Sequence, residues 1–199
     1  MNDKRYGAAA MALHWIIAVL IVVQLCLGWY MNEVLPDHSP AQDRVQDIHV
    51  TVGLSILILV LVRIGVRLTH PAPPLSRTLA KWERVLAHLS HWLFYILILV
   101  MPLTGWALVS VRHEDIPFFG LAWPGMPGLD HLARPEARAL GRQLKDIHID
   151  TLVWIALINL ALHVAGALKH QFDGSPVLWR MVPFLKAPPS GKDQGLPPT

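Results

Sequence analysis

The stretch D-I-H-I-D-T-L-V-W-I-A-L-I-N-L-A-L-H, from Asp146 to His163, is an apolar run of membrane-spanning length with a histidine near each end. The two histidines are 163 − 148 = 15 residues apart. On an α-helix this spacing separates them by roughly 22 Å along the axis and roughly 60° around it, so both look out of one side. Polar side chains are costly in hydrocarbon and are usually functional there. The stretch therefore predicts two ligand positions, one near each face of a membrane.

The composition of the whole chain is that of a membrane protein. Of the 199 residues, 53 % are hydrophobic and 16 % are charged, whereas about 25 % is usual for soluble domains. The net charge of +3 fits basic cytoplasmic loops, and no motif for nucleic acid is present, so we expect no nucleic-acid partner. The single cysteine, Cys26, excludes an internal disulfide, a thiolate zinc cluster and an iron–sulfur centre. Without C-x-x-C-H, any haem is held non-covalently.

Four apolar runs predict an all-α integral membrane protein built as a four-helix bundle. The transmembrane helices are expected at about 8–31, 48–66, 87–111 and 147–168, with Pro102 and Gly105 kinking the third. Residues 1–186 would form one membrane domain and 187–199 a disordered cytoplasmic tail.

The distribution of Lys and Arg predicts the orientation. With the N-terminus inside, ten lie in inner segments and six in outer segments, which places both termini in the cytoplasm. The second outer loop, about 112–145, contains the apolar but Pro- and Gly-broken segment I-P-F-F-G-L-A-W-P-G-M-P-G. It cannot span, and we expect it to lie at the membrane surface and cap the bundle.

The histidines fall at two depths. At the outer level stand His49 and His148, in the similar contexts Q-D-I-H-V and K-D-I-H-I, where Asp47 and Asp146 are predicted helix N-caps. At the inner level His163 has four possible partners, and His14 is preferred because it lies about two turns inside an apolar run; the others are His88, His91 and His170. Two facing imidazoles are the requirement of a six-coordinate haem. Interhelical hydrogen bonds or headgroup contacts are the alternative use of each histidine.

The chain resembles the bacterial cytochrome b561 family, the dihaem proteins of the inner membrane, over residues 1 to about 183. The motifs that carry the resemblance are, in order, A-L-H-W at 12–15, D-I-H-V-T-V-G at 47–53, R-I-G-V-R-L at 63–68 with the P-A-P-P link, L-A-H-L-S-H-W-L-F-Y at 86–95, M-P-L-T-G-W at 101–106, the H-x14-H pair, A-L-K-H at 167–170 and L-W-R-M-V-P at 178–183. It is most similar to the superoxide oxidase branch of the family.

The resemblance implies two b-type haems, with ubiquinone as electron acceptor. It assigns His49 and His148 to the outer haem iron and His14 and His163 to the inner haem iron. In relatives the two histidines that correspond to His148 and His163 are often one residue closer in sequence. An extra residue would rotate His163 by about 100°, and a local bulge in the helix would restore the geometry.

The expected reaction carries one electron at a time from superoxide outside to ubiquinone inside. Outer cations would attract the superoxide anion, although nearby acidic residues almost balance them in number; the candidates are Arg112, Arg138, Arg142 and Lys145. Candidates for the quinone site at the inner level are His88, His91, His170, Lys81 and Trp82.

Two other functions stay open at this stage. The chain would also suit a b-type subunit that passes electrons between quinone and a separate dehydrogenase or hydrogenase. A haem-free transporter or anchor is the third possibility, although the spans offer few carboxylate or thiolate ligands. Membrane lipid is an expected partner in each case, with a redox protein or a second copy of the chain as further possibilities.

Overall fold

The computed structural model describes residues 5–71, 73–74, 79–129, 131–173 and 177–187. Its main elements are α1 (Ala8–Glu33), α2 (Pro40–Thr69), α3 (Lys81–Val111), α4 (Arg134–Lys145), the π-helix η1 (Asp146–Leu152) and α5 (Val153–Phe172). Two short strands, β1 (Pro117–Phe118) and β2 (Leu121–Ala122), precede α4, and a 3₁₀ turn, η2 (Leu178–Arg180), follows α5. The predicted tail lies, apart from residue 187, outside the described residues.

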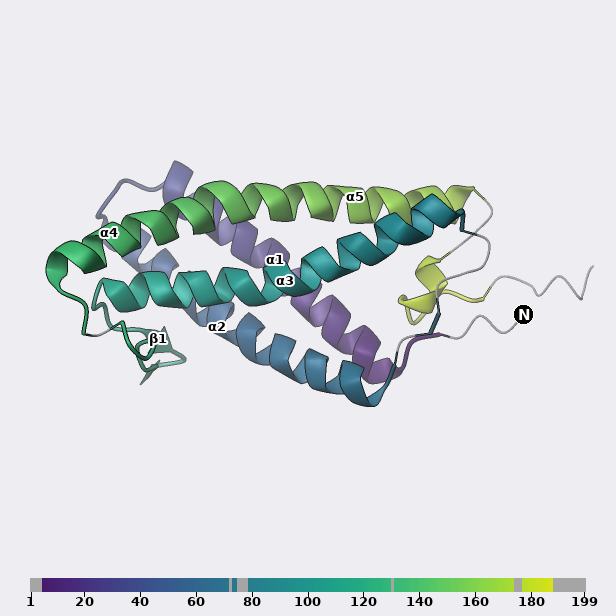
Figure 1. Ribbon diagram of the computed structural model, residues 1–199, viewed down its shortest axis with the longest axis horizontal. Coiled ribbons are helices and arrows are strands. Elements are labelled where there is room, and N and C mark those ends of the chain that lie inside the picture. The colour runs from purple at the N-terminus through teal and green to yellow at the C-terminus, as the bar shows by residue number, and fades with distance from the viewer. Residues whose placement is uncertain (1–4, 72, 75–78, 130, 174–176, 188–199) are drawn as a thin grey trace, which may run out of the picture.

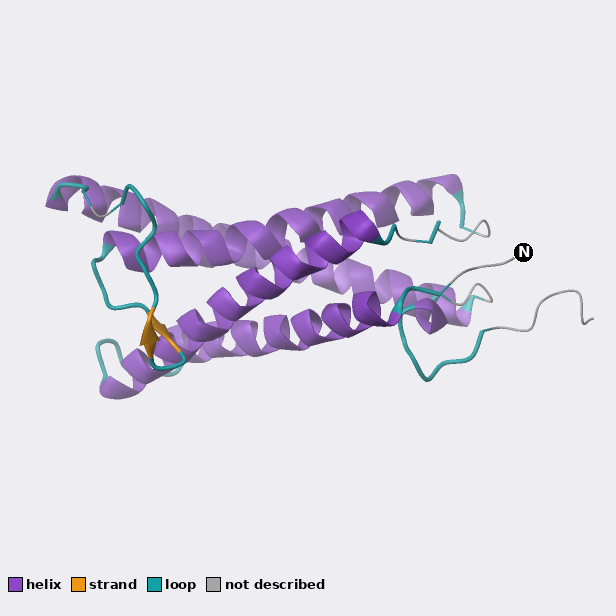
Figure 2. Ribbon diagram, turned by 90° about the horizontal axis from the view of Figure 1, so that it is seen from below, coloured by secondary structure: helices purple, strands orange, loops and turns teal. Residues whose placement is uncertain are grey.

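Four long helical rods run alongside one another to form the bundle (Figures 1 and 2). α1, α2, α3 and the continuous rod α4–η1–α5 are each long and apolar enough to cross a membrane. This agrees with the predicted four-helix membrane architecture. Tyr6 donates its backbone N–H to the carbonyl of Arg180 at 3.2 Å, so both ends of the described chain meet at one end of the bundle. We call this the terminal end, and the opposite end, which carries β1, β2 and α4, the loop end.

The helices are longer than the apolar runs predicted. α2 begins at Pro40, where Ser39 caps it by accepting from the N–H of Gln42 at 3.2 Å. The fourth rod begins at Arg134 rather than near 147. Asp47 and Asp146 therefore lie inside helical rods, and their prediction as N-caps was wrong. A continuous apolar run marks only the part of a helix that lies in hydrocarbon. Polar turns at its end extend the same helix into the aqueous layer.

The bundle buries few side chains and exposes many apolar ones. Ile17, Ile56 and Val60 form a tight contact between α1 and α2, with Val60 fully buried. Large apolar side chains such as Trp154 and Leu162 stand 63 % and 65 % exposed. A surface of this kind is suited to lipid rather than water.

α3 changes direction part-way along its length (Figure 1). Pro102 lies inside this helix and cannot donate a backbone hydrogen bond to the carbonyl one turn earlier. It is the physical cause of the predicted kink.

A small hairpin covers the loop end. Phe119 and Gly120 between its strands have φ of 51° and 80°, the conformation of the two central residues in a tight I′ turn. The hydroxyl of Thr51 on α2 lies 3.0 Å from the carbonyl oxygen of Pro117, and Ile116 is buried against Leu54 and Val109. The loop therefore packs on α2 and α3, as predicted for a cap.

Candidate functional site

His49 of α2 and His148 of η1 face each other near the loop end. Their ring centres are 6.3 Å apart and the ring planes cross at 75°. If each ring nitrogen binds one metal ion at about 2.0–2.1 Å and each ring centre lies about 1 Å further away, the centres are about 6 Å apart. The observed separation thus suits two imidazoles that bind the same metal ion. The structure brings together the two histidines that were predicted as partners.

The surroundings of this pair favour metal binding by both rings. The hydroxyl of Thr104 donates to the carbonyl of Met101 at 2.8 Å and lies 2.9 Å from Nδ1 of His148. Because a hydroxyl has one proton, Nδ1–H of His148 is the donor in the second contact. Nε2 of His148 then has a free lone pair. Nδ1 of His49 is buried without a hydrogen-bond partner among the described residues, so no hydrogen bond to that nitrogen orients this ring.

Two glycines lie directly against these rings. A Cβ atom on Gly105 of α3 would be 3.2 Å from Cε1 of His148, and one on Gly28 of α1 would be 3.4 Å from Cε1 of His49. The distance at Gly105 is short for a carbon contact, whereas the distance at Gly28 is an ordinary van der Waals contact. The absence of side chains here lets α1 and α3 approach the imidazoles closely.

His148 lies within a π-helix. η1 covers Asp146–Leu152, and the i→i+5 hydrogen bonds of such a turn take up one residue more than an α-helical turn. The structure therefore confirms the predicted bulge. The π-helical turn takes up one of the 15 residues between His148 and His163. The two side chains are therefore rotated relative to each other about as they would be at a spacing of 14 residues in a regular α-helix.

The second cluster of histidines lies nearer the terminal end. His163 of α5 packs against His91 of α3, with ring centres 5.5 Å apart, and against Phe94 at 5.2 Å. His14 of α1 interacts electrostatically with both His91 and His163. The structure thus gathers three histidines from three helices at this level, where a single pair was predicted.

Two further polar side chains lie inside the bundle and were not predicted as site residues. Arg63 of α2 donates to the carbonyl of Ala10 at 3.2 Å and interacts electrostatically with His14. Asn159 of α5 is buried and bonds Ser90 of α3, with the hydroxyl of Ser90 2.9 Å from Oδ1 of Asn159. The sequence contained one signal for Arg63, because it is a charged residue that interrupts the apolar run at 48–66.

Residues 5–184 match the family described as prokaryotic cytochrome b561. The chain belongs to this family. Membership implies b-type haem and electron transfer across a membrane. Among the described residues of this cytochrome, His, Cys, Asp and Glu form no group of three or more suited to a metal ion.

Curated relatives are similar over almost the full length of this cytochrome. "Probable superoxide oxidase CybB" of Yersinia pestis is 28 % identical, over 90 % of this chain and 97 % of the relative. "Cytochrome b561 homolog 2" of Escherichia coli (strain K12) is 24 % identical, over 91 % and 93 %. "Cytochrome b562" of Cereibacter sphaeroides is 32 % identical, over 86 % and 90 %.

The candidates for the quinone site are only partly brought together. Lys81, Trp82 and His88 are exposed at the start of α3, whereas His91 lies inside the bundle beside His163. His170, at the end of α5, is 3.2 Å from a carboxylate oxygen of Asp173.

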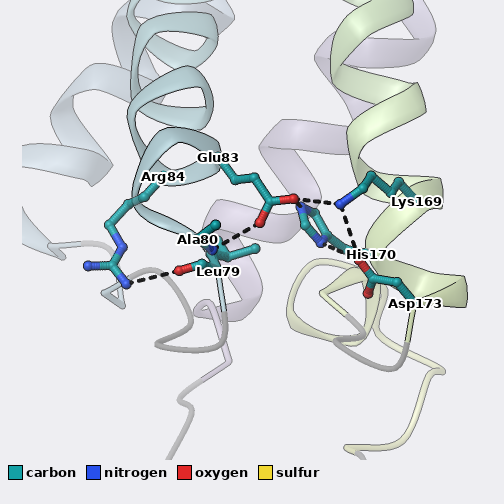
Figure 3. A network of polar contacts seen from close by, with 7 residues as sticks. All are labelled: Leu79, Ala80, Glu83, Arg84, Lys169, His170 and Asp173. Atoms are coloured by element: carbon teal, nitrogen blue, oxygen red, sulfur yellow. Dashed lines mark hydrogen bonds and ion pairs between the residues drawn. The ribbon is translucent and has the colours of Figure 1, made fainter.

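A polar network joins α3 to α5 at the terminal end (Figure 3). Glu83 accepts from the backbone N–H of Ala80 at 2.9 Å and from Lys169 at 2.5 Å, and Lys169 also reaches Asp173. His170 lies within 3.9 Å of Glu83. The network places exchangeable protons from two helices at this surface.

The four cations predicted to attract superoxide are all exposed at the loop end. Arg112 is 3.8 Å from a carboxylate oxygen of Glu114, which offsets its charge. Arg138, Arg142 and Lys145 are spaced i, i+4 and i+7 on α4, so they share one face of that helix.

Proposed function

We propose that this b561 family member holds two b haems and carries electrons from superoxide at the loop end to ubiquinone at the terminal end. The loop-end haem would be bound by His49 and His148, and the terminal-end haem by His14 and His163. The observation that carries the proposal is the facing pair His49 and His148, with ring centres 6.3 Å apart. A second histidine cluster lies nearer the terminal end, and its member His163 is on the same α4–η1–α5 rod as His148.

The haems supply one-electron redox chemistry when bound. The residues of the chain supply ligation, orientation and exclusion of water. Thr104 fixes the proton of His148 on Nδ1 and leaves Nε2 for the iron. Gly28 lies against the ring of His49, and Gly105 lies against the ring of His148. Larger side chains at these positions would displace the rings.

The loop end supports the capture of an anion. Arg138, Arg142 and Lys145 form a positive face on α4, directly before the π-helix that carries His148. A local positive potential increases the rate at which a small anion arrives. The name of the Yersinia pestis relative, "Probable superoxide oxidase CybB", agrees with superoxide as this anion.

The terminal end supports the reduction of a quinone. Reduction of ubiquinone to ubiquinol consumes two electrons and two protons, and the network of Glu83, Lys169, His170 and Asp173 offers groups that exchange protons with the cytoplasm. The excess of Lys and Arg in segments at this end supports a cytoplasmic location for both termini. The protein would thus be a multi-pass protein of the bacterial inner membrane.

An electron-transfer subunit without its own substrate is the second candidate. The relative with 32 % identity is named only "Cytochrome b562", and a groove of about 330 Å³ lies at the loop end beside Asp47, Thr51 and the exposed Phe119. A redox protein that docks there would replace superoxide as the donor.

Reduction of the haems by superoxide tests the proposal. The purified protein should give a low-spin b-type spectrum with about two haems per chain after dithionite, and superoxide should reduce the haems and then added ubiquinone. Superoxide dismutase should abolish the signal, and His49→Ala should lose the loop-end haem and the reaction. His113→Asn is the control, because His113 is exposed with φ of 55°, which asparagine tolerates.

The outcomes separate the candidate functions. A folded preparation without haem would overturn the dihaem assignment. Two haems that superoxide cannot reduce, together with a catalytic subunit that co-purifies, would favour the electron-transfer subunit.

A further inference from the structure

Arg63 is a positive charge inside the bundle whose position calls for an anion. It lies 69 − 63 = 6 residues before the end of α2 at Thr69, roughly 9 Å along the helix. A long arginine side chain at such a depth commonly extends outward to the headgroups. Here its guanidinium instead donates to the carbonyl of Ala10 on α1, and Arg63 lines a cavity together with Tyr95 of α3.

The charge of Arg63 is not balanced by an acidic side chain in the described part of the protein. No Asp or Glu oxygen there lies within 4.0 Å of the guanidinium of Arg63 or of Arg67, one turn further along α2. Arg67 lies over the ring of Tyr6, 5.9 Å from its centre, and adds to the positive charge. Arg63 and Arg67 are both partly buried, and a partly desolvated charge without a counter-ion is unfavourable, so a negative group brought to this place would be bound favourably.

A small cavity lies at the same place. It measures about 20 Å³ and is lined by Tyr6, Ala10, Arg63, Val66, Arg67, His70 and Tyr95. A volume of about 10–15 Å³ on this measure holds one water molecule. The cavity therefore has room for one or two oxygen atoms, such as those at the tip of a carboxylate, next to two guanidinium groups and two tyrosines.

The cavity adjoins the terminal-end histidine cluster. Ala10 is four residues before His14 on α1, and Tyr95 is four residues after His91 on α3, so each shares a helix face with a histidine of that cluster. Arg63 bridges these two faces and interacts electrostatically with His14. An anion in the cavity would thus belong to whatever molecule the histidines bind.

We propose that Arg63, with Arg67 and Tyr95, forms a carboxylate-binding site that takes a propionate group of the terminal-end haem. This inference rests on the proposed function, because it assumes a haem at that level. The site would hold the haem in one orientation, which ligation by two histidines alone would not fix. It would also favour the reduced haem, because a nearby cation stabilises the added electron.

Redox titration of the haem-loaded protein tests the site. Arg63→Leu should lower the midpoint potential of the terminal-end haem by an amount equal to about a tenfold change in its reduction equilibrium, about 59 mV for one electron. The loop-end haem should keep its potential. Arg63→Lys should recover part of the shift, because it keeps the charge but not the planar fork.

Arg84→Leu is the matched control. Arg84 is also an arginine of the terminal-end half and donates to the carbonyl of Leu79, but it does not line the cavity. It should leave both potentials within error. An equal shift in Arg63→Leu and Arg84→Leu would overturn the proposal, because it would indicate a general effect of surface charge.

A second measurement distinguishes a propionate from a lipid phosphate. The infrared difference spectrum between reduced and oxidised protein should show a changed carboxylate band in Arg63→Leu relative to wild type. If Arg63→Leu instead loses a bound phospholipid, measured by mass spectrometry, and both haem potentials are unchanged, the anion is a lipid phosphate and the propionate assignment fails. The dihaem function would survive that outcome, whereas a wild-type protein with no haem would overturn both proposals.

Discussion

The hydroxyl of Thr104 on α3 lies 2.9 Å from Nδ1 of His148, while it donates its own proton to the carbonyl of Met101 at 2.8 Å. The direction of the first hydrogen bond follows from the second. His148 is held as the tautomer with its proton on Nδ1, before any metal binds. His49, which faces His148, has no such contact at Nδ1 within the described chain, so the two proposed ligands differ in the hydrogen bond at Nδ1.

Replacing Thr104 should weaken the loop-end haem site. Thr104→Val keeps the shape of the side chain and removes the acceptor for Nδ1–H of His148, so haem affinity at this site should fall by about 10–100-fold. Thr104→Ser should restore most of it. Haem content per chain and the reduced b-type spectrum are the measurements, and equal haem retention by Thr104→Val and wild type would show that His148 needs no orientation by Thr104.

Adding a methyl group at Gly105 should also disturb His148. The new Cβ atom would be 3.2 Å from Cε1 of the ring, so the ring or α3 must move, at a cost of about 1–3 kcal/mol. Gly105→Ala should shift the spectrum and potential of the loop-end haem. Gly166→Ala on α5 is the matched control, since a Cβ there meets nothing within 4 Å. It should leave both haems unchanged and stabilise the helix by about 0.5–1 kcal/mol. Equal behaviour of the two variants would contradict the close contact.

The sequence was sufficient to predict the parts of this site that depend on position along a helix. The four runs of apolar residues predict the four rods, and the depths of His49 and His148 within them predict the pair at the loop end. Both follow from length and rise per residue, which the chain alone specifies. The bulge that η1 provides was expected only from the resemblance to the family, in which the histidine pair is often one residue closer.

The terminal-end cluster could not be predicted in the same detail. Which of His14 and His91 approaches His163 depends on how α1 and α3 rotate about their own axes. A helix that is apolar on every side does not reveal in its sequence which face points inward. For the same reason, the sequence showed that Arg63 interrupts an apolar run but not that it reaches Ala10 and Tyr95. The sequence did not predict that α2 begins at Pro40 and that the fourth rod begins at Arg134. The first turns of both helices are polar, so they lie outside the apolar runs from which the helices were predicted.

Substitution of the terminal-end histidines should identify the ligands there. We expect His14→Ala to lose the terminal-end haem, because the proposed ligands are His14 and His163. His91→Ala should keep that haem with a shifted potential, because His91 packs against the ring of His163 at 5.5 Å between centres. Haem content and separate redox titration of the two centres measure both effects. Loss of the haem in His91→Ala, with retention in His14→Ala, would reverse the assignment.

Deleting one residue from the π-helix should be tolerated, because the wide turn of η1 holds one residue more than an α-helical turn. Deletion of Thr151 lets the turn relax to an α-helix, and His148 and His163 should keep their relative rotation and both haems. Deletion of Ala161 shortens the chain by the same amount but lies in the regular helix α5, where it rotates His163 by about 100° relative to the residues before it. Restoring His163 would require the segment between the bulge and Ala161 to rotate instead, which would break the hydrogen bonds between Asn159 and Ser90. The Ala161 deletion should therefore lose the terminal-end haem while the Thr151 deletion retains it, as measured by haem stoichiometry; loss of haem in the Thr151 deletion would mean that the bulge has a role of its own at His148.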